Sequence, residues 1–148
     1  MNGTEKVIAH LQMIQANINR HGLYSFLVKG LSVVFVISTE VLLFYFLTII
    51  STIGFIFIIV STVQILLIIG FWMIDAYFLQ QERLFCHHYD AIRQQNDTDL
   101  NMYVGIHKDK PKSSWNSVIF SFTFTIFYSI EIVLVLLIPA IGIYDLIF

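Results

Sequence analysis

Charged side chains are scarce in this sequence. They make up 12% of its 148 residues, whereas an ordinary soluble domain carries about 25%. Hydrophobic residues reach 57%, and the mean hydropathy is +0.79. The opening residues are too polar for a cleaved signal peptide. We therefore expect an all-α integral membrane protein rather than a soluble domain.

Cysteine is nearly absent too. Cys86 stands alone, which excludes an internal disulfide and suggests a reduced cytosolic thiol. The adjacent His87 and His88 diverge by about 100° on a helix, and no second ligand cluster has zinc-site spacing. The stretch 97–101 resembles the start of a calcium loop but lacks the required glycine and the closing glutamate. No phosphate loop, nucleophile elbow or pair of catalytic carboxylates occurs, so we expect no enzyme, metal or cofactor.

Long apolar runs dominate instead. From Gly30 to Ile74 the only charge is Glu40. A single helix of that length would measure about 68 Å, roughly twice the hydrocarbon thickness of a bilayer. The run is therefore predicted to be a hairpin with spans at about 25–49 and 55–78. Small, polar and glycine residues place its turn near 50–54.

Both sides of this hairpin carry further predicted helices. Residues 4–21 form a candidate amphipathic helix, in which five apolar residues recur at helical spacing: Val7, Ile8, Leu11, Ile14 and Ile18. The second span continues outward to about residue 94, and a polar loop follows. A third span is predicted at about 116–138, ending near Pro139 and containing one charge, Glu131.

The distribution of basic residues sets the expected orientation. All eight fall on one side of the three-span arrangement: Lys6, Arg20, Lys29, Arg83, Arg93, Lys108, Lys110 and Lys112. Cytosolic loops are enriched in Lys and Arg. We therefore expect a cytosolic or interfacial helix at 1–22, a transmembrane hairpin at 23–79, a cytosolic segment at 80–115, and a third span with an outer tail at 116–148. This arrangement predicts a bacterial inner membrane protein with its C-terminus outside.

Polar residues form a stripe on each predicted span. Ser25, Lys29, Ser32, Thr39 and Glu40 share one face of the first span. On the second span, Gln64 aligns with Asp75, and the same face continues through Glu82, Cys86, Tyr89 and Arg93. Three residues of this face are candidates for coupling the cytosol to the membrane: Asp75, Glu82 and Tyr89. Glu131 lies within a hydroxyl-rich stripe of the third span.

Two interpretations of these stripes remain open. Hydroxyls, amides and protonated glutamates can join one helix to another. Alternatively, they line a water-filled path, with Glu40, Glu131, Lys29 and Gln64 as pore-lining candidates. Three helices of one chain cannot enclose a pore, so the second interpretation requires a homo-oligomer, for which we expect a tetramer.

The basic residues expected on the cytosolic side form a surface whose role has two possible interpretations. The loop around Lys108, Lys110 and Lys112 is typical of an anchor beside anionic lipid. Together with Arg83 and Arg93, and multiplied by symmetry, the same charges would also suit a phosphate-bearing ligand.

Several strings resemble one family. They are HLQMIQANINR, SFLVKG, FWMIDAYFLQQERLF and YDAIR, followed by TDLNM and SSW, covering His10 to Trp115. They are similar to the SLATT-like membrane effectors of bacterial anti-phage systems, with the channel effector of the nucleotidyltransferase-linked Hailong system as the nearest analogue. The chain departs from the family's pattern at Tyr24, Leu31 and Cys86.

This resemblance implies an oligomeric ion channel that depolarises the inner membrane during abortive infection. It also implies gating by a nucleotide or oligonucleotide that a partner nucleotidyltransferase makes. A non-conducting membrane subunit that recruits a cytosolic partner is the alternative from another class. A phage holin is disfavoured, because three-span holins usually place the C-terminus inside.

Overall fold

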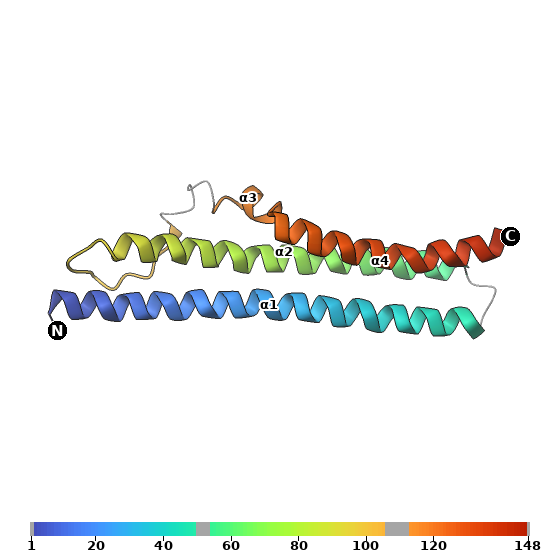
Figure 1. The fold of residues 1–148 in the computed structure, drawn as a ribbon, viewed down its shortest axis with the longest axis horizontal. Helices are drawn as coiled ribbons and strands as arrows, with labels where there is room; N and C mark the ends of the chain where they lie inside the picture. The colour runs from blue at the N-terminus through green and yellow to red at the C-terminus, as the bar shows by residue number, and fades with distance from the viewer. Residues whose placement is uncertain (1, 50–53, 106–112, 148) are drawn as a thin grey trace. The chain divides into compact units, whose positions relative to one another are not determined.

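The computed structural model describes residues 2–49, 54–105 and 113–147, and every regular element in these ranges is a helix. Two long helices, α1 (Gly3–Ile49) and α2 (Gly54–Ile92), precede a single short turn of helix, α3 (Trp115–Ile119), and α4 (Phe122–Ile147). Figure 1 labels each of them. The all-α prediction is confirmed for this part of the chain.

Helix α1 joins two segments that the sequence had suggested separately, the amphipathic helix at 4–21 and the span at 25–49. Gly22 stands between them, and a mid-helix glycine costs roughly 0.5–1 kcal/mol relative to alanine. Its φ is not positive, so the backbone continues without a break. Burial on both sides of Gly22 outweighs this local cost.

The ends of the long helices agree with the sequence. Helix α1 ends at Ile49 and α2 begins at Gly54, while the hairpin turn expected near 50–54 falls on residues 50–53, which lie outside the described residues. The predicted extension of the second span is also present, because α2 continues to Ile92.

The third predicted helix differs from expectation at both ends. It does not run unbroken from 116, because α3 ends at Ile119, where the Ser121 amide bonds to the Val118 carbonyl three residues back. At the other end, α4 continues through Pro139 to Ile147. The prediction of a stop at the proline is wrong: a helix survives there by giving up one backbone hydrogen bond.

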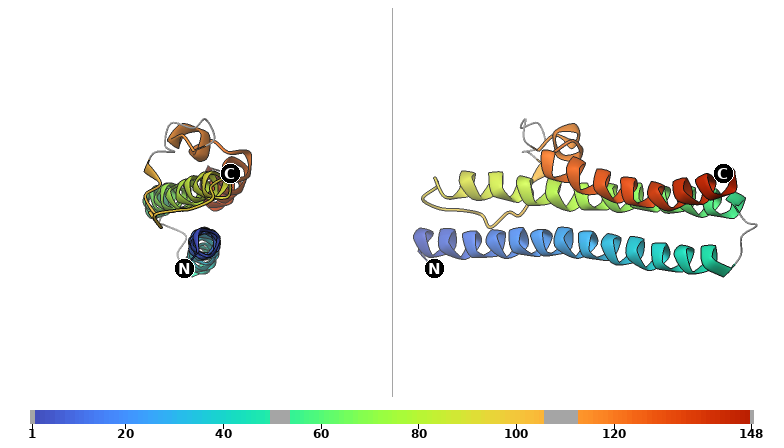
Figure 2. Two further views of the ribbon diagram at one scale, coloured as in Figure 1. Left: turned by 90° about the vertical axis from the view of Figure 1, so that its left-hand side faces the viewer. Right: turned by 45° about the vertical axis from the view of Figure 1, so that its right-hand side comes forward.

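The chain divides into two compact units. Unit 1 comprises Met1–Leu27 and Ile74–Ser121, and unit 2 comprises Val28–Met73 and Phe122–Phe148. Within each unit α1 and α2 run antiparallel, as Figure 1 and the right-hand view of Figure 2 show. The contacts agree, because His10 meets His88 and His21 meets Phe78 in unit 1, while Phe35 meets Phe71 in unit 2.

The core of unit 1 is built from the predicted apolar face of the N-terminal segment. Val7 and Ile14 pack against Ile92, and five partly buried residues surround them: Leu11, Ile18, Phe85, Tyr89 and Met102. Only Ile8 of the five predicted positions faces outward, with 52% of its surface exposed. The helical spacing therefore identified most of this interface.

Unit 2 is held by α4 lying on both long helices. Tyr128 is fully buried and stacks on Trp72 of α2, with ring centroids 5.7 Å apart and planes 14° from parallel. On the α1 side, the Lys29 ammonium lies 4.3 Å from the centre of the Phe124 ring. An ammonium over an aromatic face is attracted by the ring quadrupole.

Two helices in the described part, Gly3–Phe46 and Ile58–Ile92, are long and apolar enough to cross a membrane. A shorter apolar helix occupies Phe122–Leu137. By length and composition, both long helices could therefore cross a membrane.

Removing the Ile14 side chain tests the core of unit 1. We expect Ile14→Ala to destabilise that unit by about 2–5 kcal/mol, because a fully buried isoleucine leaves a cavity when truncated. Met13→Ala is the matched control, since Met13 is 48% exposed, and should change stability by less than about 0.5 kcal/mol. Denaturant titration of the chain in detergent micelles measures both, and equal effects would contradict this packing.

Candidate functional site

The polar stripes of the three long helices meet within the units. In unit 2, the Gln64 amide donates to the Glu40 carboxylate at 3.1 Å and to the Thr39 hydroxyl at 2.9 Å. Gln64 is only 1% exposed. The amide thus joins α2 to α1, which is the helix-to-helix role that the stripe suggested.

The second glutamate is held in the same way. The Ser32 hydroxyl of α1 donates to the Glu131 carboxylate of α4 at 2.6 Å, and both residues are buried. This contact and the Gln64 contact place both carboxyl groups between helices of one unit. A buried ionisable group in an apolar helix bundle is costly unless it is bonded.

These contacts leave part of each polar group unused. One carboxylate oxygen of Glu40, one of Glu131 and the Gln64 carbonyl oxygen are enclosed by protein atoms and have no hydrogen-bond partner within the described ranges. Buried acceptors of this kind normally find a donor, a water or an ion. These atoms are therefore where unit 2 can receive a proton, a water molecule or a cation.

Unit 1 contains the third pairing of this type. The Ser25 hydroxyl of α1 donates to the Asp75 carboxylate of α2, and Asp75 is fully buried. Two other residues predicted to couple the membrane to the cytosol lie further along α2: Glu82 and Tyr89 are both half-buried, and Tyr89 packs on the unit 1 core. Asp75 and Tyr89 therefore both contact α1 or the core that it builds.

A hollow of about 510 Å³ opens beside α2. It is lined by four residues of α2 and one of α3: Arg83, Cys86, His87, Asp90 and Ser117. Arg83 and His87 are one turn apart and present nitrogen donors, while Asp90 presents an acceptor. The hollow is thus suited to a ligand with an anionic group and a hydrogen-bond donor.

Only one of the five predicted ligand-binding residues lines this hollow. Arg93 is exposed beyond the end of α2, while Lys108, Lys110 and Lys112 lie outside the described residues. Sequence analysis had not assigned a role to Ser117 or Asp90 there, because their proximity depends on how α3 packs.

Cys86 sits in the hollow as a protonated thiol. Partial displacement of water by protein atoms raises its pKa, and the nearby carboxylates of Glu82 and Asp90 raise it further. The thiolate is the reactive form of cysteine. The side chain is therefore a weak nucleophile despite being exposed.

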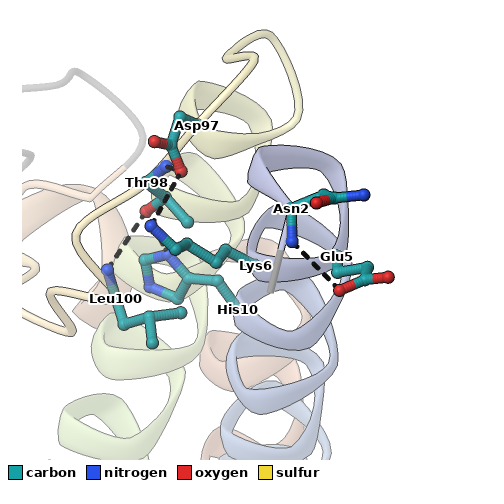
Figure 3. A network of polar contacts seen from close by, with 7 residues as sticks. All are labelled: Asn2, Glu5, Lys6, His10, Asp97, Thr98 and Leu100. Carbon is teal, nitrogen blue, oxygen red and sulfur yellow. Dashed lines mark hydrogen bonds and ion pairs between the residues drawn. The ribbon is translucent and has the colours of Figure 1, made fainter.

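A polar network that the sequence did not reveal closes the far end of unit 1. After α2 the chain turns back toward α1, and His10, buried on α1, lies 2.8 Å through Nδ1 from the Thr98 hydroxyl (Figure 3). Lys6 forms an ion pair with Asp97 at 3.7 Å. His88 of α2, also buried, donates through Nε2 to the Asn101 carbonyl at 2.9 Å. The strings containing both histidines were recognisable, but their meeting depends on tertiary structure.

The segment that this network holds is strained. Leu100 has a φ of +59°, in the left-handed region that costs a non-glycine residue roughly 1–2 kcal/mol. Its amide donates to the Thr98 hydroxyl at 3.3 Å, and the next amide donates to the Asp99 carboxylate. These side-chain bonds stabilise the tight turn.

The comparisons with known proteins add no relative. No family model, curated protein or solved structure matches this chain. Within the described ranges, no three His, Cys, Asp or Glu side chains converge to hold a metal ion. The site is therefore interpreted from its own geometry.

The strain at Leu100 predicts a stabilising substitution. Leu100→Gly should stabilise unit 1 by about 1 kcal/mol, because glycine adopts positive φ without a steric penalty. Leu100→Ala is the control, since it removes a similar exposed side chain but keeps the Cβ that causes the strain. Denaturant titration in micelles compares them, and a glycine variant no more stable than the alanine variant would contradict the strained turn.

The environment of Cys86 predicts slow alkylation. Iodoacetamide should modify Cys86 at pH 7.5 several-fold more slowly than it modifies a free cysteine, because little thiolate is present. Asp90→Asn should accelerate the reaction by removing one of the carboxylates that raise the thiol pKa. Asp99→Asn is the control, since Asp99 is not among the groups that act on the thiol. Equal rates in all three proteins would refute this electrostatic account.

Proposed function

We propose that this chain is an integral membrane protein that spans the inner membrane three times and assembles into an ion-conducting homo-oligomer. The single observation that carries the proposal is a pair of carboxyl groups held between otherwise apolar helices: Glu40, which is half-buried, and Glu131, which is buried. Ionisable residues at such positions are rare in membrane proteins and usually mark an ion pathway or a proton relay.

The exposed surface of unit 2 supports the membrane assignment. Large apolar side chains cover the outer faces of its helices, with exposed fractions of 44–64%, as in Leu31, Val34, Ile37, Val41, Leu66, Ile126 and Ile130. Soluble monomers rarely expose a continuous apolar patch larger than a few hundred Å². An apolar surface of this extent is accommodated by lipid chains rather than by water.

The third crossing is supported by the length of α4. Its 26 residues correspond to about 39 Å of helix at about 1.5 Å per residue, enough for a hydrocarbon core of about 30 Å. Three crossings place all eight basic residues on one side, which favours a cytosolic N-terminus and an external C-terminus.

Conduction requires more than one copy, because three helices of one protomer cannot surround a water-filled path. In the proposed oligomer, which we take to be a tetramer, Glu40, Glu131 and Gln64 line the path, and their unbonded oxygens, which are enclosed within the single protomer, become exposed to water when the channel opens. Lys29 lies toward its cytosolic mouth. Acidic rings of this kind favour cations over anions.

The proposed physiological role follows from the resemblance to SLATT-like effectors. Opening would collapse the membrane potential of an infected bacterium and stop phage replication. A phosphate-bearing ligand, a nucleotide or oligonucleotide from a partner nucleotidyltransferase, would control opening. The hollow beside Arg83 and the basic residues of the following loop are the proposed binding surface.

One observation favours a second candidate. Both glutamates are bonded to polar side chains of their own protomer, as expected if the stripes serve only to join helices. In that case the protein is a non-conducting membrane subunit, and the 79–115 segment recruits a cytosolic partner. Ion flux distinguishes the two candidates.

Flux measurements with Glu40→Gln test the proposed pore. Glutamine preserves the size of the side chain and an acceptor for Gln64, so assembly should persist while the negative charge disappears. We expect cation flux from liposomes to fall, or the cation-to-anion permeability ratio to drop, by about tenfold, as for the loss of roughly 1.4 kcal/mol of ion stabilisation. Ser38→Ala is the matched control, since that exposed hydroxyl bonds to its own helix. Assembled wild-type protein that conducts under no trigger would exclude the pore.

Charge reversal tests the ligand surface. Binding of a short oligodeoxynucleotide should weaken as salt rises, because phosphate contacts release counterions. The Lys108/Lys110/Lys112→Glu triple variant, and separately Arg83→Glu, should abolish it. Arg20→Glu is the control, a cytosolic charge outside the proposed surface. Binding that survives the reversals, or that Arg20→Glu weakens equally, would count against a specific site.

A further inference from the structure

Two buried imidazoles hold the segment that follows α2. His10 and His88 are 0% and 5% exposed, and their ring centroids are 5.4 Å apart in an edge-to-face arrangement. His10 is bonded to Thr98 and His88 to Asn101. We name these four residues the histidine clasp. It joins α1, α2 and the segment 97–101 at one end of unit 1, and Figure 3 shows two of its members, His10 and Thr98.

The buried site around His10 favours a neutral imidazole ring. A proton on His10 would add a cation in a site that excludes water, directly against a second imidazole. Burial lowers the pKa of His10 below its usual 6.5 and His88 lowers it further, while the Asn101 carbonyl and the Asp99 carboxylate oppose the shift. The other charged groups at the clasp, Lys6 of α1 and Asp97 of the segment, are paired with each other.

Backbone strain favours release of the segment 97–101. The strained residue, Leu100, lies between the two residues that the histidines hold. A strained backbone persists only where the surrounding contacts enforce it, and such residues are concentrated in switch regions. Loss of the histidine bonds would remove that enforcement and let Leu100 relax.

We propose that the histidine clasp is an acid-released latch: protonation of His10 detaches the segment 97–101 from the α1–α2 pair. The released state binds more protons than the latched state between the lowered pKa of His10 and 6.5, so the latch weakens as pH falls through that window. Above about pH 6.5 its full strength is present.

The latch lies close in sequence to the basic residues from His107 to Lys112, which follow the segment 97–101. The latch adds a proton input that is independent of the proposed pore and of the ligand that would control it.

A spin label on the segment tests the latch. The label is placed at Tyr103→Cys in a Cys86→Ser background, because Tyr103 is 64% exposed and Cys86 is the sole native cysteine. The full-length chain is studied in lipid nanodiscs from pH 7.5 to pH 5.0. We expect the mobile fraction of the label to rise at least twofold, with a midpoint below pH 6.5. An unchanged spectrum over this range would overturn the proposal.

Substitutions identify the groups responsible. With His10→Gln and His88→Gln together, the acid-induced increase should vanish, since glutamine can hydrogen bond but cannot take up a proton in this range. His21→Gln is the control: His21 is stacked on Phe85, outside the clasp, and its loss should leave the increase intact. His10→Arg should give the mobile spectrum already at pH 7.5. An increase that persists in the double variant, or that His21→Gln abolishes, would contradict the latch.

Discussion

Polar groups buried between apolar helices must find partners, and this constraint shapes both units. An unbonded amide or hydroxyl costs a few kcal/mol away from water, and an unpaired charge costs far more. The chain meets the constraint with one polar pairing per contact: Ser25 with Asp75, Ser32 with Glu131, and Gln64 with Glu40. Apolar contacts favour association of the helices, whereas these pairings select one register among the many that apolar side chains would allow.

The same pairings explain how structure and function can share residues. A carboxyl group bonded through one oxygen holds two helices together, and its second oxygen stays available to a proton, water or cation. Glu40 and Glu131 both have this asymmetry. Helix pairing and ion handling are therefore compatible, and in the proposed oligomer the bonded oxygen positions the free one.

Sequence alone predicted what depends on periodicity and composition. Helical class, the extension of α2 and the apolar face containing Val7 and Ile14 follow from local pattern. The polar faces also followed, because 100° per residue determines which side chains share a face. Gln64 and Asp75 were expected on one side of α2, and each bonds to α1 within its own unit.

What depends on tertiary structure could not be predicted. His88 was considered as a possible metal ligand, whereas it is buried against His10, because the antiparallel register of α1 and α2 brings the two residues together. The break before α4 and the helix through Pro139 likewise reflect packing that outweighs local preference. No spacing rule connects Thr98 to His10 or Ser117 to Arg83.

The structure of the assembled protein in a lipid bilayer tests the central claim most directly. The account predicts a closed symmetric ring that, in its open state, surrounds a water-filled path to which the second oxygens of Glu40 and Glu131 are exposed. A monomer, or an oligomer whose axis is sealed by apolar side chains while both glutamates remain bonded between helices, would contradict it.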